Sequence, residues 1–96
     1  MDPIARSAKI KADLFTVGYV LLDVDRRHKL PLGTASRTLW EPNSLGEVAI
    51  AAALACEPHE LWPERYDASG QRLSPQPPKN YLRPQPRWQR RNDKAA

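Results

Sequence analysis

The stretch of residues 21 to 40, LLDVDRRHKLPLGTASRTLW, constrains the fold more than any other part of this 96-residue chain. Its apolar residues are spaced as in two short helices, with a break between them. Pro31 lies at the break, because proline does not easily continue a helix but can begin the next one. The pattern predicts one helix over about residues 20 to 28 and a second over residues 32 to 39.

Two helices joined in this way are typical of a helix-turn-helix, in which the first helix braces a second that enters a groove of DNA. The inward-facing positions are apolar or small: Val24, Leu30, Ala35 and Leu39. The outward-facing positions are small or polar, and those predicted to contact DNA are Arg26, Arg27, Lys29, Gly33, Thr34, Ser36 and Arg37. The same spacing also occurs in helical bundles whose basic face only meets solvent.

Each predicted contact has its own chemistry. The three cations before the second helix would neutralise phosphates, which adds affinity without sequence information. A glycine at position 33 makes sense where another molecule comes close to the backbone. Arg37 has the forked geometry that binds guanine O6 and N7, and Thr34 and Ser36 are able to reach bases or phosphates.

A first helix is expected before this stretch. Asp2 is a suitable N-cap, Pro3 suits the first turn, and Gly18 should end the helix. Its apolar residues give an approximately helical stripe, which we expect to face the core: Ile4, Ala8, Ile10, Ala12 and Phe15.

An alanine-rich run predicts the central helix of the domain. Ser44 and Glu47 form a Ser-x-x-Glu capping box directly before it, so a helix over residues 45 to 55 is expected. This helix is apolar nearly all round and should therefore lie in the core. A short helix with Trp62 turned inward should follow, and Pro63 should end it.

Charge divides the chain into two parts. The whole chain carries +4, but residues 71 to 96 contain seven basic residues and one acid, which leaves −2 for residues 1 to 70. The C-terminal part is also rich in proline and poor in the apolar residues that a packed core needs. We therefore expect residues 1 to 70 to form one DNA-binding helix-turn-helix domain and residues 71 to 96 to be an extended, disordered basic tail.

Three interpretations of the tail stay open. Basic and aromatic residues alternate in it, a pattern that is able to follow a nucleic-acid backbone: Tyr81, Arg83, Arg87, Trp88, Arg90 and Arg91. Its PxxP spacing is of the kind that some protein modules bind. A charged tail also keeps a chain soluble. Beside a DNA-binding transcriptional regulator, the alternative function is therefore a protein-interaction adaptor that uses this tail on a helical scaffold.

Other classes of function find little support in the sequence. Cys56 is the only cysteine, so no disulfide forms within the chain and a reducing compartment fits. His28 and His59 have no partners at metal-ligand spacing. We expect no metal, cofactor, small-molecule ligand or enzymatic activity. Because no signal peptide and no run of about 18 apolar residues is evident, we expect a cytoplasmic protein without membrane contact.

The chain resembles the Ner family, small helix-turn-helix regulators of Mu-type phages and their bacterial relatives. The resemblance depends on the run GEVAIAAALACEPHELWPERY, residues 46 to 66, and above all on its LWPxRY end. Upstream, DVDRRHKLPLGTASRTL is similar to the family's helix-turn-helix without a gap, so the resemblance covers about residues 5 to 66. Lys29 stands where the family commonly has glycine, and Asp25 stands where alanine or serine is more usual.

The resemblance implies an all-α, five-helix fold of the repressor-like type. It also implies sequence-specific binding of double-stranded DNA and regulation of transcription, usually repression, in a prophage or a host circuit. No heptad repeat or obvious apolar stripe indicates a stable dimer, so a monomer that pairs with a second copy on DNA is compatible with the sequence.

Overall fold

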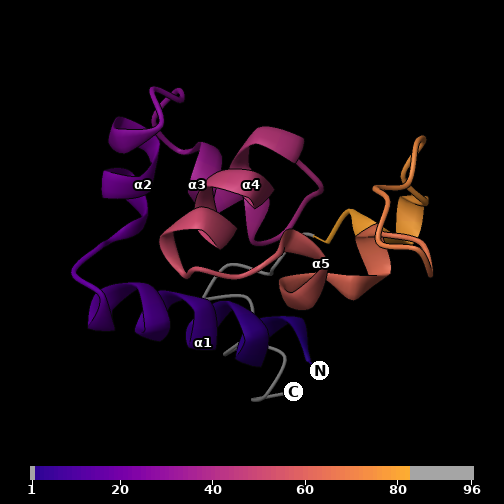
Figure 1. Cartoon of the computed structure of the whole chain (residues 1–96), viewed down its shortest axis with the longest axis horizontal. Coiled ribbons are helices and arrows are strands. Elements are labelled where there is room, and N and C mark those ends of the chain that lie inside the picture. Colours follow the sequence, from indigo (N-terminus) through magenta and orange to yellow (C-terminus); the bar gives the residue numbers. More distant parts are fainter. Residues whose placement is uncertain (1, 83–96) are drawn as a thin grey trace, which may run out of the picture.

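The computed structural model describes residues 2 to 82 and is all-α over that range (Figure 1). The helices are α1 (Pro3–Thr16), α2 (Leu21–Arg27), α3 (Thr34–Thr38), α4 (Ser44–Ala53) and α5 (Pro58–Leu61), with the 3-10 turns η1 (Pro63–Arg65) and η2 (Pro78–Asn80). The predicted all-α, five-helix fold is confirmed. The described residues contain no strand, and their one isolated β-bridge joins Tyr66 to Arg72. None of these helices is long and apolar enough to cross a bilayer.

One apolar core holds the helices together. Figure 1 shows α1 running beneath α2, α3 and α4. The buried side chains come from all four helices and from the residues directly after α3 and α5. The buried core cluster consists of Ile10, Leu14, Val24, Ala35, Leu39, Ala49, Ile50 and Trp62. The prediction that Trp62 packs inward is confirmed, because its side chain is fully buried. Leu30 and Trp40 are partly buried and pack against the same cluster.

The predicted inward face of α1 was confirmed for Ile10 but wrong for Ile4, Ala8, Ala12 and Phe15. The helix buries Ser7, Ile10 and Leu14, whereas Phe15 is 74% exposed and Ile4 is 53% exposed. Both sets have helical spacing, so α1 carries apolar residues on two faces. Periodicity alone does not decide which of two such faces meets the core; the packing of α1 against the other helices decides it.

Helix α3 starts two residues later than predicted, at Thr34 instead of Leu32. Gly33 lies outside the helix as its N-cap, with a left-handed φ of 98°. Glycine adopts this conformation without the steric cost that a Cβ brings. A Cβ at Gly33 would meet nothing within 4 Å, so backbone conformation and not a close neighbour explains the glycine here.

The predicted N-cap of α4 was wrong by one residue. Asn43, not Ser44, is the N-cap, and its side chain accepts a hydrogen bond from the backbone nitrogen of Gly46 at 2.9 Å. The Glu47 carboxylate accepts one from the Asn43 backbone nitrogen at 2.8 Å. The capping-box pattern selects Ser44 because it stands three residues before Glu47, but the buried Glu47 side chain reaches four residues back.

Residues 71 to 82 also differ from the expected extended tail, because they pack along the domain. Four hydrogen bonds attach residues 73 to 82: Leu73 N to Arg65 O at 3.0 Å, Gln76 Nε2 to Arg65 O at 2.9 Å, Asn80 Nδ2 to Glu64 O at 3.0 Å, and Leu82 N to Trp40 O at 2.7 Å. The prolines fix the chain direction while these polar groups hold it to the body. The rest of the predicted tail, residues 83 to 96, lies outside the described residues.

Candidate nucleic-acid interface

A buried carboxylate fixes the two helices of the predicted helix-turn-helix relative to each other. Asp25 in α2 is fully buried, and its two oxygens accept hydrogen bonds from the backbone nitrogens of Gly33 and Ala35, each at 2.8 Å. These two N–H groups belong to the start of α3, where no intrahelical acceptor is available. Asp25, at a position where the Ner family more usually has alanine or serine, therefore caps the start of α3 from the neighbouring helix.

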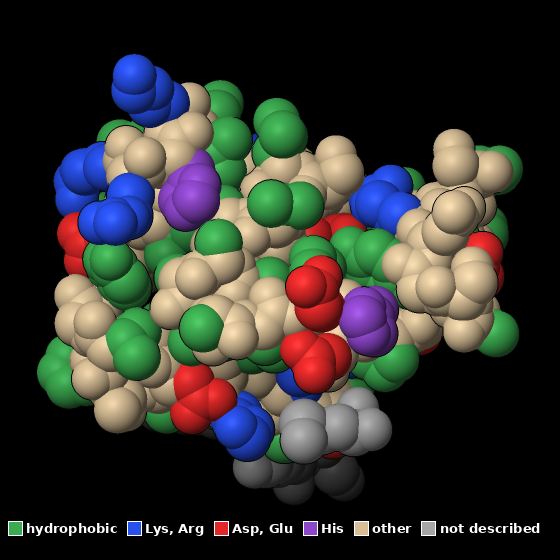
Figure 2. Space-filling view, in the orientation of Figure 1, with side chains coloured by type: hydrophobic (Ala, Val, Ile, Leu, Met, Phe, Trp, Pro, Cys, Tyr) green, Lys and Arg blue, Asp and Glu red, His purple; other side chains and the backbone are tan. Residues whose placement is uncertain are grey.

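The predicted phosphate-binding cations lie together at the end of α2 and in the turn that follows. Arg26, Arg27 and Lys29 are all exposed. Figure 2 shows Lys and Arg side chains gathered over this end of α2, beside a histidine. Lys29 has a left-handed φ of 55°, which explains why glycine suits this position in other turns of this kind.

Two of these arginines are partly positioned by neighbours. The Arg26 guanidinium lies 3.7 Å from the Asp23 carboxylate, and both side chains are largely exposed. The Arg27 guanidinium lies over the Tyr19 ring, 5.7 Å from its centroid. Exposed contacts of this kind contribute little to stability, about 0–1 kcal/mol, so both guanidinium groups stay available to an anion.

The predicted reading residues of α3 fall into two groups. Thr34 and Gly33 are half-buried, and both donate hydrogen bonds within the protein. The Thr34 hydroxyl donates to Pro31 O at 2.6 Å, and the Gly33 N–H donates to the Asp25 carboxylate. Ser36 and Arg37 are exposed, and no side chain of residues 2 to 82 binds either of them. The donors that the outer face of α3 offers to a partner are therefore these two side chains.

One exposed apolar residue at this surface was not predicted from the sequence. Leu32 lies two residues before α3 and is 64% exposed. The apolar pattern placed Leu32 inside the predicted helix over residues 32 to 39 and therefore did not predict an exposed turn residue. No sequence signal identifies its exposure; only the late start of α3 does.

Residues 6 to 77 match the family described as winged helix-turn-helix DNA-binding, and that range is three quarters of the chain. The chain belongs to this family. No curated protein matches the chain, and no solved structure matches it either. Membership of this family implies DNA as the partner of the domain. In the described residues one isolated bridge joins Tyr66 to Arg72 and closes a turn.

A second buried carboxylate ties that turn to the rest of the domain. Glu47 is fully buried and accepts hydrogen bonds from the Tyr66 hydroxyl at 2.7 Å, from Arg72 Nε at 3.1 Å and from Arg65 Nη1 at 3.3 Å. The Gly46–Glu47 and Arg65–Tyr66 pairs that mark the family resemblance therefore meet in space. They build the scaffold behind the helix-turn-helix, not its exposed face.

The charged and polar groups in this cluster shift each other's pKa values. Burial acts to raise the pKa of Glu47, but the hydrogen bonds from Arg72, Tyr66 and the Asn43 backbone outweigh it, so this pKa lies below its usual value. Burial and the neighbouring Glu47 carboxylate raise the pKa of Tyr66. Burial lowers the pKa of the Arg65 guanidinium. The cluster is thus a buried carboxylate held in its charged form by its donors.

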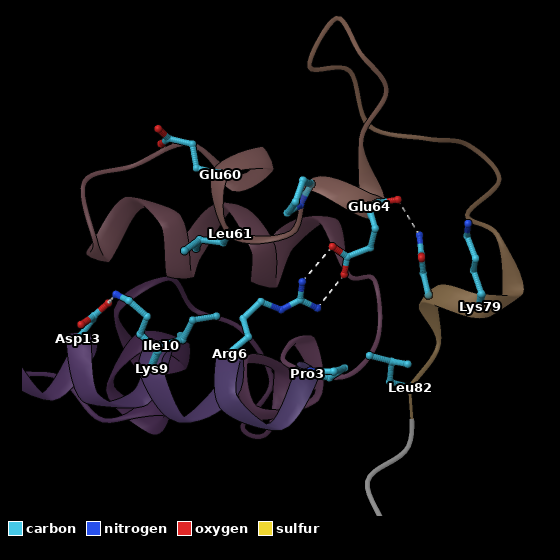
Figure 3. A pocket seen from close by; sticks show the side chains of 12 residues that line it. Pro3, Arg6, Lys9, Ile10, Asp13, Glu60, Leu61, Glu64, Lys79 and Leu82 are labelled. Carbon is cyan, nitrogen blue, oxygen red and sulfur yellow. Dashed lines mark hydrogen bonds and ion pairs between the residues drawn. The ribbon is translucent and has the colours of Figure 1, made fainter. Parts of the chain in front are cut away.

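A cleft of about 630 Å³ lies away from α2 and α3, between α1, α5 and the η2 segment (Figure 3). Four of its charged residues are paired: Arg6 donates to both oxygens of Glu64 at 2.9 and 2.7 Å, and Lys9 lies 2.7 Å from Asp13. Burial acts to raise the pKa of Glu64, but the hydrogen bond from Arg6 leaves it lowered. Because cations and acids alternate along this cleft, it does not offer the uniformly positive surface that DNA requires.

Proposed function

We propose that this protein is a sequence-specific, double-stranded-DNA-binding transcriptional regulator that places α3 in the major groove. The observation that carries the proposal is the exposed positive surface made by Arg26, Arg27, Lys29 and Arg37 on the helix-turn-helix of a DNA-binding family. Cations gathered on a rigid pair of helices suit the phosphates along the edge of one groove.

The surface divides into positioning and reading groups. Arg26, Arg27 and Lys29 bind phosphates and set the register of the protein on the duplex. Ser36 and Arg37 read base edges, with the Arg37 guanidinium on guanine O6 and N7. Gly33 and Thr34 lie between these groups and bring the backbone and the Thr34 side-chain oxygen near the groove.

We also propose that the exposed Leu32 side chain takes part in reading. An apolar side chain at a base edge suits the C5-methyl group of thymine, which is the one apolar feature of the major groove. This assignment gives Leu32 a reason to remain exposed.

The test is a pair of arginine substitutions on the same surface. A bound site is first selected from random DNA, and the affinities of Arg37→Ala and of the matched control Arg26→Ala are measured on that site and on random duplexes. We expect Arg37→Ala to reduce the ratio of specific to random binding by about 1–3 kcal/mol, or roughly 5- to 150-fold. We expect Arg26→Ala to weaken both duplexes alike and to lower the salt slope by about 0.9.

Equal weakening of both duplexes by Arg37→Ala would exclude base reading by this side chain. A wild-type protein that prefers no sequence after selection would overturn the proposed sequence specificity altogether.

We further propose the finer assignment that the sequence resemblance suggests. The protein is a Ner-like repressor of a prophage or host circuit, acts in the cytoplasm where the DNA lies, and binds as copies that associate on DNA. Transcription in vitro from a promoter that overlaps the selected site measures the direction of the effect, and increased transcript would contradict repression.

The adaptor alternative receives less support. Binding of a PxxP segment needs an extended, accessible strand. Gln76 and Asn80, on either side of Pro77 and Pro78, are hydrogen-bonded to the body of the domain. This part of the proline-rich segment is therefore packed against its own domain.

A further inference from the structure

Four large apolar side chains are exposed where α1 ends and α2 begins. Phe15 is 74% exposed, Val17 53%, Val20 51% and Leu22 43%. We call these four residues the α1–α2 patch. They lie within eight positions of the chain, and Figure 2 shows hydrophobic side chains over the segment that joins the two helices. Nothing in the proposed DNA contact uses them.

A small cleft opens beside the patch. It has a volume of about 270 Å³, and its walls are mostly apolar: Leu14, Phe15, Tyr19, Val20, Leu21 and the stem of Lys11. Phe15 therefore both protrudes into solvent and forms one wall of a hollow next to it. Such a surface suits an apolar partner, because a phosphate backbone requires cationic and hydrogen-bonding groups.

We propose that the α1–α2 patch is the surface through which two copies of this chain associate on DNA, with Phe15 of each copy inserted into the cleft of the other. A two-fold interface must be self-complementary, so the same surface has to supply both the inserted group and the hollow. The α1–α2 patch supplies both. The inference rests on the proposed function and identifies the surface for the association proposed there.

The patch is continuous with the proposed DNA surface. Tyr19, a wall of the cleft, carries the Arg27 guanidinium over its ring at 5.7 Å. Two copies joined at this cleft would therefore bring two sets of phosphate-binding cations close together. Helix-turn-helix proteins use such pairs to bind two half-sites on one duplex.

The small size of the patch favours a weak association. Four side chains of this kind expose on the order of 300–400 Å² together, which is within the range of the largest patches on monomers. A stable interface buries about 800 Å² on each partner. The free protein is therefore monomeric at micromolar concentration, and it pairs when adjacent sites on DNA raise the effective concentration to about millimolar.

The experiment compares duplexes with one and with two copies of the selected site, the two copies being spaced by one to two helical turns. We expect wild-type protein to bind the second site about 10-fold or more tightly than the first at a favoured spacing. Phe15→Ser should reduce this factor to about one and leave the single-site affinity unchanged. The matched control is Ile4→Ser, which replaces an exposed apolar residue of the same helix and should keep the wild-type factor.

The proposal would be overturned if wild-type protein bound the second site no more tightly than the first at every spacing. It would also be overturned if Phe15→Ser weakened binding to a single site as much as it weakened binding to the second site. A second measurement needs no DNA. Sedimentation equilibrium near millimolar protein should give wild-type an average mass above the 10.9 kDa of one chain and Phe15→Ser the monomer mass. Equal masses for the two would contradict the assignment. If the wild-type protein self-associates through Phe15 but prefers no DNA sequence, the proposed function would be rejected and the proposed interface would stand.

Discussion

The Asp25 carboxylate accepts a hydrogen bond from the backbone nitrogen of Gly33 at 2.8 Å, across the turn that joins α2 to α3. Its second oxygen accepts one from Ala35, so a single buried side chain satisfies two backbone N–H groups at the start of α3. These two hydrogen bonds tie the start of α3 to α2. The proposed base reading by α3 would depend on the direction of this helix, because hydrogen bonds to base edges need a defined geometry.

Removal of this carboxylate should disturb both stability and binding. Asp25→Ala leaves two backbone donors without a partner, and we expect the free energy of unfolding in urea to fall by about 2–4 kcal/mol. Specific binding should fall more than random binding. Asp13→Ala, which breaks an exposed ion pair with Lys9, is the control and should cost less than about 1 kcal/mol. Equal effects of both substitutions would contradict the proposed brace.

Lys29 offers a way to separate fold from phosphate binding. A residue with a side chain in the left-handed region costs about 1–2 kcal/mol, and glycine avoids most of this. Lys29→Gly should therefore raise the free energy of unfolding by about 0.5–1 kcal/mol while it weakens binding to any duplex and lowers the salt slope by about 0.9. Lys29→Ala keeps the backbone strain and removes the charge, so it should weaken binding without the gain in stability. Unchanged binding in both variants would remove Lys29 from the interface.

The cap of α4 is tested by two neighbouring substitutions. Asn43→Ala should cost about 1 kcal/mol, because the Asn43 side chain accepts a hydrogen bond from the Gly46 backbone nitrogen. Ser44→Ala should stay within about 0.5 kcal/mol, because Ser44 is exposed and lies inside the first turn. Thermal and urea unfolding measure both. The reverse order of effects would restore Ser44 as the cap.

Acid should destabilise the domain through the buried carboxylate of Glu47 and the half-buried carboxylate of Glu64. The pKa values of Glu47 and Glu64 lie below their usual value of 4.5, so the unfolded chain takes up protons first as the pH falls. Stability is fully present above pH 4.5 and is lost as the pH falls through the lower pKa values of the folded state. Urea midpoints between about pH 7 and about pH 3 measure this loss. Glu47→Gln should be less stable at neutral pH, and its urea midpoint should change less between the two pH values. A pH dependence equal to that of the wild type would contradict the role of Glu47.

The last prediction concerns the basic C-terminal residues. Truncation after Leu82 keeps the hydrogen bonds of the packed segment, including Leu82 to Trp40, and removes Arg83, Arg87, Arg90, Arg91 and Lys94. If these cations bind phosphates, affinity for random duplexes falls and the salt slope decreases by about 0.9 for each phosphate that is no longer bound. An identical slope in the two proteins would exclude DNA binding by this segment.

Much of the fold follows from local pattern. Capping residues, prolines and apolar spacing predicted the helices and the inward positions Val24, Ala35 and Leu39, because these depend on neighbours a few residues apart. The outward placement of Ser36 and Arg37 follows from the same spacing. The roles of these residues toward DNA stay predictions.

The sequence by itself determined that this chain forms short helices around a small core and that a polar helix follows a cationic turn. Tertiary structure alone decided which apolar face of α1 meets the core, where α3 begins, and that residues 71 to 82 lie along the body. Each of these depends on partners distant in sequence: Asp25 for α3, Trp62 and its neighbours for α1, and Arg65 and Trp40 for the C-terminal segment. Local propensity does not contain such contacts, since they exist only after the chain has packed.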